Sequence, residues 1–295
     1  MIPAKIKIGD TIGIPYPSRV ADPIQVNRIK TVLERFGFGI RIGHNAYANT
    51  YEYTASAQER ADDINAMVKD PMVKMIFFSG GDAGAEVLPY LDYEAIAHNP
   101  KIFSSFSDGT CILNAVYAMT GLVTYYGQGP GQFQYLRYYD WNHFETNFMK
   151  EEKEKEFFKD TPWVTLCDGV ASGILIGGYP SLYAMMLTTK YGKVDKNKKY
   201  LLFLEAHEHF DPVAQAATAF ALIEQSDMMD CVTGLLVGNY SPQVPPSYLE
   251  MIARIGQRRN IPVVYCDDFG HGNSHAILPI GKTATLDATA QTLWF

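Results

Sequence analysis

A serine at the junction of an expected strand and an expected helix is the residue best suited to covalent chemistry. Residues 102–106 form a short apolar run typical of a buried strand, and a helical pattern begins at about Thr110, so Ser107 falls in the turn between them. Such a strand-turn-helix arrangement is a nucleophile elbow, in which a tight turn lifts the hydroxyl out of the sheet. Small residues on either side, Ser105 and Gly109, leave room for that turn, although the usual GxSxG pattern has become SxSxG.

Backbone N–H groups near this serine could stabilise an oxyanion. Asp108 lies just before the expected helix, at whose N-terminus N–H groups point outward and carry a partial positive charge. Gly80 and Gly81 follow another expected strand. The GGxxG segment that they begin lacks the Lys-Ser/Thr of a P-loop, and its glycine spacing differs from that of the dinucleotide fingerprint. Both differences favour a backbone-donor turn over a nucleotide site. The alternative is that Ser107 or Asp108 only caps the helix.

A serine nucleophile needs a base and a group that orients the base. His271 lies just beyond the expected strand at 261–265, and Glu205 follows the expected strand at 200–204. Ligands of parallel sheets bind at the carboxyl ends of the strands, where Ser107, Glu205 and His271 could converge as a catalytic triad.

A metal site is the competing interpretation of one of these segments. Glu205, His207 and His209 alternate, so an extended backbone would place them on one face. One glutamate and two histidines are plausible zinc ligands, which leaves a metallohydrolase open.

The elements around these residues indicate an α/β protein. Strand-like and helix-like segments alternate, which predicts mostly parallel sheets. The expected strands are 11–15, 73–78, 102–106, 123–126, 200–204, 232–237 and 261–265, and the expected helices are 26–36, 56–68, 110–119, 212–225 and 246–258.

Two lobes are the simplest organisation. We expect an N-terminal lobe at 1–135 that carries the nucleophile, a connecting segment at 136–165, and a C-terminal α/β lobe at 166–295 that carries Glu205 and His271. Within the connecting segment, the charged run at 150–159 is typical of a solvated amphipathic helix.

Composition excludes several classes of function. The chain has 295 residues, a net charge of −7 and no basic patch, which argues against a nucleic-acid partner. We see no leader peptide and no apolar run long enough for a membrane span, so the cytoplasm is expected. Four scattered cysteines predict neither a disulfide framework nor a metal cluster.

Taken together, these residues resemble the LD-carboxypeptidase family of serine peptidases, which includes the microcin C self-immunity peptidases. The resemblance covers nearly the whole chain. It rests on segments similar to the family's ER-x-x-D-[IL]-N, G-[YF]-S-D-x-T, glutamate-strand, histidine and trailing P-[LI]-G motifs, in that order: 59–65, 106–110, 203–205, 269–271 and 278–281.

The resemblance implies a Rossmann-like N-terminal lobe with a mostly parallel sheet, a smaller C-terminal α/β lobe, and an active site between them. It implies a Ser107–Glu205–His271 triad that needs no cofactor, a homodimer, and cleavage of an amide in a muropeptide or in a peptidyl-aminoacyl nucleotide. The chain departs from the family at Ser79 and Ser105, where Arg and Gly are common, and at 179–180. These departures leave the three triad residues in place and bear on how the substrate is recognised.

Two tryptophans are candidate substrate contacts. Trp141 ends an aromatic stretch and could stack on a base or fill the lobe interface, and Trp163 lies in a second candidate specificity region. A non-catalytic binding protein with a decayed elbow remains the second hypothesis, because Ser79 and Ser105 depart from the family pattern.

Overall fold

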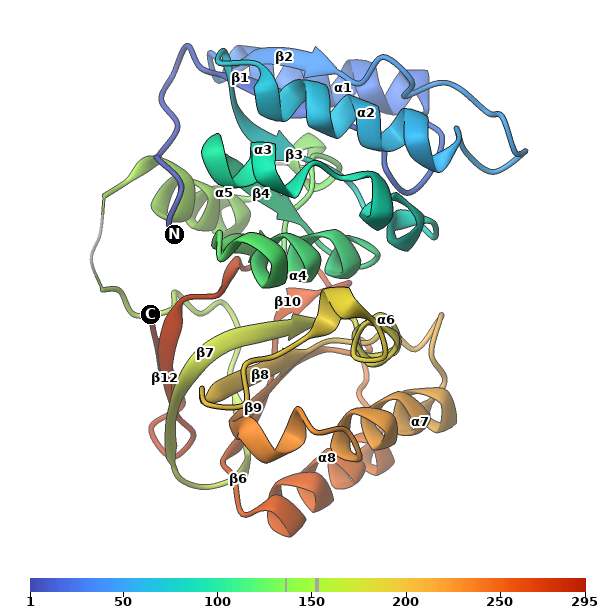
Figure 1. Cartoon of the computed structure of the whole chain (residues 1–295). Coiled ribbons are helices and arrows are strands. Elements are labelled where there is room, and N and C mark those ends of the chain that lie inside the picture. The colour runs from blue at the N-terminus through green and yellow to red at the C-terminus, as the bar shows by residue number, and fades with distance from the viewer. Residues whose placement is uncertain (136, 152–153) are drawn as a thin grey trace. The chain divides into compact units, whose positions relative to one another are not determined.

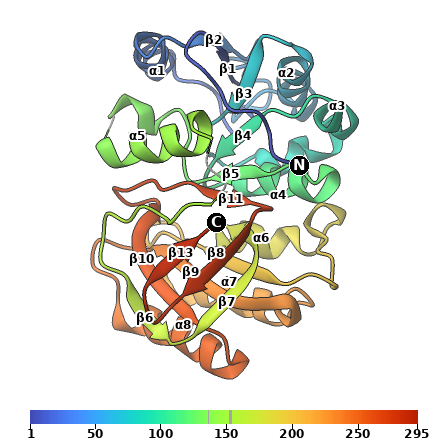
Figure 2. The same cartoon turned by 90° about the vertical axis from the view of Figure 1, so that its left-hand side faces the viewer.

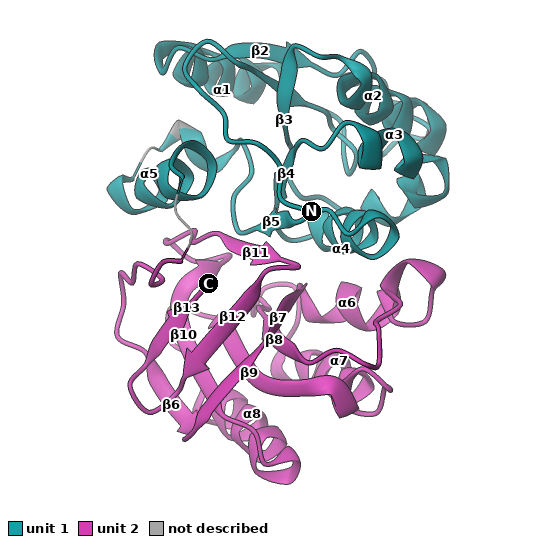
Figure 3. Cartoon of the chain, turned by 60° about the vertical axis from the view of Figure 1, so that its left-hand side comes forward, with its two compact units in different colours: residues 1–151 teal, residues 152–295 magenta. Residues whose placement is uncertain are grey.

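The computed structural model describes residues 1–135, 137–151 and 154–295. The chain divides into two compact units, residues 1–151 and 152–295, which are teal and magenta in Figure 3. The division falls inside the segment expected to connect two lobes. No helix among the described residues combines the length and apolar character needed to cross a bilayer.

The first unit is built on parallel strands in the order β2-β1-β3-β4-β5. This doubly wound order reverses direction between β1 and β3, where α/β proteins form ligand sites at the strands' carboxyl ends. Figure 1 shows the helices flanking these strands. The bounds are β1 (Thr11–Ile14), α1 (Pro23–Arg35), β2 (Gly39–Ile42), α2 (Ala57–Lys69), β3 (Val73–Phe77), η1 (Gly84–Tyr90), α3 (Tyr93–His98), β4 (Ile102–Ser105), α4 (Gly109–Thr120), β5 (Thr124–Tyr126), η2 (Gln132–Gln134), α5 (Tyr138–Phe144) and η3 (Glu145–Met149).

Local signals fix the ends of two helices in this unit. At the start of α2, Ser56 accepts a hydrogen bond from the Glu59 N–H while the Glu59 carboxylate accepts one from the Ser56 N–H, a capping box. At the end of α4, Gly121 adopts φ +72°, the left-handed conformation that stops a helix. The helices predicted at 56–68 and 110–119 are therefore confirmed.

The second unit contains a mixed sheet in the order β13-β12-β7-β8-β9-β10-β6. Strands β7 to β10 run parallel, whereas β12, β13 and β6 pair antiparallel at the flanks. Figure 2 labels β6, β7 to β10 and β13 of this sheet. The bounds are β6 (Val164–Cys167), β7 (Val170–Gly178), α6 (Pro180–Met186), η4 (Lys190–Gly192), β8 (Tyr200–Leu204), α7 (Val213–Glu224), η5 (Met229–Cys231), β9 (Val232–Asn239), α8 (Pro246–Arg259), β10 (Val263–Gly270), β11 (Leu278–Ile280), β12 (Thr283–Asp287) and β13 (Thr292–Trp294). The predicted fold class, two α/β units with mostly parallel strands, is confirmed.

The helix predicted over the charged run at 150–159 is wrong for the described residues there. The helical segment ends at Met149, and no helix is found at 150–151 or 154–159. Instead, Lys155 exchanges two backbone hydrogen bonds with Phe295, and the Phe157 N–H donates to the carbonyl oxygen of Leu293 in the C-terminal strand. Pairing with a strand more than 130 residues away overrides the local helical preference.

Candidate active site

Ser107 has the backbone geometry of a nucleophile elbow. It lies between β4 and α4 with φ +56°, a conformation that few non-glycine residues adopt. Its N–H donates to the Tyr126 hydroxyl at 3.0 Å, which helps to hold the turn. A Cβ on Gly109 would overlap the side chain of Ser105. The missing glycine at 105 is therefore accommodated because residue 109 is glycine.

The Gly80–Gly81 turn approaches the nucleophile closely. A Cβ on Gly80 would lie 2.8 Å from the Ser107 Cβ and 3.3 Å from its Oγ, and a Cβ on Gly81 would lie 2.5 Å from the carbonyl oxygen of Ser18. Only glycine allows this approach of backbone to side chain. Within the first unit, the structure therefore brings the predicted backbone-donor turn next to the predicted nucleophile.

Asp108 occupies the N-cap position of α4, but its side chain makes no cap hydrogen bond. The carboxylate instead accepts a hydrogen bond from the Gly84 N–H at 2.6 Å. The interpretation of Asp108 as a helix cap is therefore wrong. The sequence did not predict this contact, because an aspartate that caps a helix and an aspartate that binds a distant loop look the same in the sequence.

Glu205 and His271 form a buried pair in the second unit. The Glu205 Oε2 lies 2.9 Å from the His271 Nδ1, and the Glu205 side chain has no solvent exposure. Glu205 follows β8 and His271 follows β10, which runs to Gly270, five residues beyond the expected strand end. Gly270 has φ +112°, and a Cβ there would lie 2.9 Å from Glu205 Oε2, so this glycine leaves room for the carboxylate.

The carboxylate controls the protonation of the imidazole. Burial alone lowers the pKa of His271, but the charge of Glu205, its hydrogen bond to the ring and the charge of Asp211 together raise the pKa above its ordinary value. A histidine whose Nδ1 is held by a carboxylate presents its Nε2 as the reactive nitrogen. The pair thus has the electrostatics of an oriented general base.

Three aromatic side chains surround His271; Tyr179 and Phe210 were not predicted as site residues, and His207 was considered only as a zinc ligand. The rings of Tyr179, His207 and Phe210 lie with their centroids 5.4, 5.6 and 5.7 Å from the His271 ring. Phe210 is 59% exposed and offers an aromatic surface beside the imidazole. The departure of Tyr179 from the family pattern was the sequence signal that could have identified it. No local sequence pattern indicated Phe210.

The geometry contradicts the zinc alternative. After β8 the backbone leaves the extended conformation and enters a turn at 208–210. His207 Nδ1 accepts the N–H of His209 at 3.1 Å, which occupies that ring nitrogen. No group of three His, Cys, Asp or Glu side chains within the described ranges is arranged to hold a metal ion.

The two candidate tryptophans have well-defined packing partners. Trp141 stacks on Phe36 with ring centroids 4.4 Å apart, inside the first unit. Trp163 is 4% exposed, and its Nε1 donates to the Asp268 carboxylate at 2.7 Å. A contact of either ring with substrate stays a prediction, as does the meeting of Ser107 with His271.

Comparisons with known proteins agree with these features. The profile of the LD-carboxypeptidase N-terminal domain matches residues 12–127, and that of the C-terminal domain matches residues 172–286. The solved structure of an MccF-like protein from Bacillus anthracis has a TM-score of 0.92 and 26% identity, and the match covers 100% of this chain and 99% of that one.

Two curated relatives are described differently. A Bacillus subtilis protein described as a "probable murein peptide carboxypeptidase" is 26% identical, over 98% of this chain and 92% of its own length. The microcin C7 self-immunity protein MccF of Escherichia coli is 24% identical, over 97% and 93%. The two domain matches, together with the nucleophile elbow, show that the chain belongs to the LD-carboxypeptidase family of serine peptidases.

Proposed function

We propose that Ser107 is the nucleophile of a Ser107–Glu205–His271 triad that hydrolyses an amide next to a terminal residue. The buried Glu205–His271 pair carries this proposal, because a carboxylate 2.9 Å from an imidazole nitrogen is the base-and-orienter half of such a triad. Ser107 belongs to the first unit and the pair to the second. The proposal requires the Ser107 hydroxyl to come within hydrogen-bond reach of His271 Nε2.

In the proposed reaction, the Ser107 Oγ bonds to the amide carbon while His271 takes the proton of the Ser107 hydroxyl. The carbonyl oxygen becomes an oxyanion, which the N–H groups of Asp108 and of Gly80–Gly81 would stabilise. His271 then gives the proton to the leaving amine as the C–N bond breaks. Water, activated by the same imidazole, hydrolyses the acyl-enzyme and restores the serine.

The substrate class follows from two separate supports. The Bacillus subtilis relative is assigned to murein peptides, which favours a muropeptide. Aminoacyl nucleotides are favoured by MccF, which has been solved with aspartyl sulfamoyl adenosine, and by the exposed Phe210 ring next to His271, which could stack on a base.

As the family resemblance implies, we also propose a homodimer, which light scattering of the purified chain would test.

An active-site serine probe tests the catalytic proposal. A fluorophosphonate should label wild-type protein at Ser107. The Ser107→Ala variant should keep its thermal unfolding temperature, lose labelling and lose hydrolysis of both substrate classes. Ser172→Ala, a serine change on a strand of the second unit, serves as the control and should label normally. A folded wild-type protein that neither labels nor hydrolyses either substrate would instead indicate a binding protein.

A further inference from the structure

The side chain of Asp108 has no part in the proposed reaction, which uses only its backbone N–H. Yet the carboxylate is 1% exposed and directly follows the nucleophile in sequence. It accepts the Gly84 N–H at 2.6 Å, and a Cβ on Gly84 would lie 2.5 Å from the same carboxylate oxygen. The carboxylate therefore joins the nucleophile elbow to the loop that contains the Gly80–Gly81 turn.

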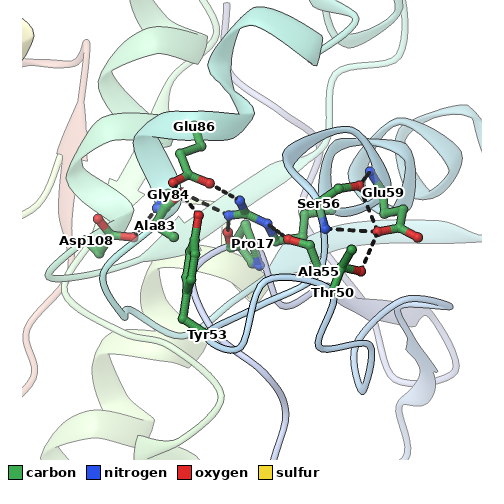
Figure 4. A network of polar contacts seen from close by, with 11 residues as sticks. Pro17, Thr50, Tyr53, Ala55, Ser56, Glu59, Ala83, Gly84, Glu86 and Asp108 are labelled. Atoms are coloured by element: carbon green, nitrogen blue, oxygen red, sulfur yellow. Dashed lines mark hydrogen bonds and ion pairs between the residues drawn. The ribbon is translucent and has the colours of Figure 1, made fainter.

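A second buried charge holds the other side of the same peptide group. Arg60, also 1% exposed, donates from its guanidinium to the carbonyl oxygen of Ala83 at 2.9 Å. The Ala83 carbonyl and the Gly84 N–H belong to one peptide bond, so Arg60 and Asp108 hold that peptide at both ends. Figure 4 shows Ala83 and Gly84 next to the Asp108 carboxylate.

Arg60 is itself fixed by the surrounding loops. Its guanidinium also donates to the carbonyl oxygens of Ala55 and Pro17 and pairs with the Glu86 carboxylate. That carboxylate accepts a hydrogen bond from the Tyr53 hydroxyl (Figure 4). The Ala83–Gly84 peptide is thus anchored through Arg60 to the segment after β1 and through Asp108 to the elbow. The turn at Gly80–Gly81 lies between these anchors and the end of β3.

This arrangement is costly for folding. Burial raises the pKa of Asp108, although the Ser18 side chain and the Gly84 N–H oppose the rise. A raised pKa means that the ionised carboxylate is less stable at this position than in water, so its charge lowers the stability of the fold at neutral pH. Groups held at such a cost concentrate at functional sites.

We propose that the Asp108 carboxylate is a positioning residue for the oxyanion hole, a role that rests on the proposed function. Through the Ala83–Gly84 peptide it holds the Gly80–Gly81 turn against Ser107. The backbone N–H groups of the turn are then directed at the oxyanion before the substrate arrives. Without the carboxylate the turn would shift, and stabilisation of the transition state would be lost while substrate binding remained.

The test compares Asp108→Ala with Asp108→Asn. Alanine removes the acceptor for the Gly84 N–H, whereas asparagine keeps an oxygen there. Since loss of one oxyanion donor costs about 10²–10³-fold in kcat, we expect Asp108→Ala to lower kcat by about 10²-fold with KM changed by less than about threefold. The affinity for a peptide boronate, which forms a tetrahedral adduct on serine, should fall by a similar factor. Asparagine should restore most of both losses.

Asp63→Ala is the matched control for loss of a buried carboxylate. Asp63 is 6% exposed in the same unit, and it accepts the Asn45 N–H at 3.0 Å. This variant should lower the unfolding temperature while kcat stays within about twofold of wild type. An equal kcat loss in Asp63→Ala, a wild-type kcat in folded Asp108→Ala, or a loss confined to KM would each overturn the positioning role.

Two further variants separate this inference from the catalytic proposal. If Asp108→Ala does not fold, Asp108→Ser replaces it, because a serine hydroxyl is too short to reach the Gly84 N–H; wild-type kcat in folded Asp108→Ser overturns the role. Full activity in Ser107→Ala would refute the triad itself. An inactive Ser107→Ala together with normal boronate affinity in Asp108→Ala would refute only the positioning role.

Discussion

The His271 Nδ1 lies 2.9 Å from the Oε2 of Glu205, a carboxylate with no solvent exposure. Glu205 lies at the end of β8 and His271 at the end of β10, with β9 between them in the sheet. The pair therefore depends on the order of three parallel strands rather than on one loop. Because strands of a packed sheet are rigid, the imidazole is oriented before any substrate binds.

Glu205→Gln should impair the base and shift its titration. A side-chain amide can donate to Nδ1 and so stabilise the wrong tautomer, and the corresponding change in a serine protease lowers kcat by about 10⁴-fold; we expect roughly 10²–10⁴-fold here. The wild-type pKa of His271 is raised, so kcat/KM should rise as pH increases through an inflection above the ordinary value of about 6.5. In the variant this inflection should move to lower pH. Glu208→Gln, a change of an exposed glutamate nearby, should leave the wild-type profile; an unmoved inflection in Glu205→Gln would contradict the role of the pair.

Gly270→Ala should damage the same pair through sterics. The position has φ +112°, and a Cβ would lie 2.9 Å from Glu205 Oε2. The strained backbone should lower the free energy of unfolding by about 1–3 kcal/mol, and the displaced carboxylate should lower kcat by about tenfold or more. Gly9→Ala is the matched control, because Gly9 has φ +97° with no atom near its Cβ position. Equal kcat in both variants would show that the close contact with Glu205 is unimportant.

Much of the fold could be predicted because its signals are local. The Ser56–Glu59 capping box and Gly121 mark helix ends through contacts within a few residues. The contact between Glu205 and His271 was also predictable, because each residue directly follows a strand of one parallel sheet. By contrast, the pairing of Lys155 and Phe157 with the C-terminal strand, and the contact of Asp108 with Gly84, join segments that only the folded chain brings together. Periodicity and composition contain no information on such partners.

Ser56→Ala should destabilise the first unit without affecting chemistry. The change removes the side-chain acceptor for the Glu59 N–H and half of the capping box, which typically costs about 1 kcal/mol in the free energy of unfolding. Chemical denaturation would measure the loss. Ser56→Asp keeps an acceptor at the N-cap and should recover most of the stability. A stability unchanged in Ser56→Ala would mean that packing alone fixes the start of α2.

Trp163→Phe should lower stability more than Trp141→Phe. The indole Nε1 of Trp163 donates to Asp268, whose side chain is fully buried, so phenylalanine leaves a buried carboxylate oxygen short of a partner. This should cost about 1–3 kcal/mol in the free energy of unfolding. At position 141, phenylalanine retains a ring to stack on Phe36, and the loss should be smaller. KM is measured in parallel, because a raised KM with unchanged stability in Trp163→Phe would place that ring against the substrate instead of against Asp268.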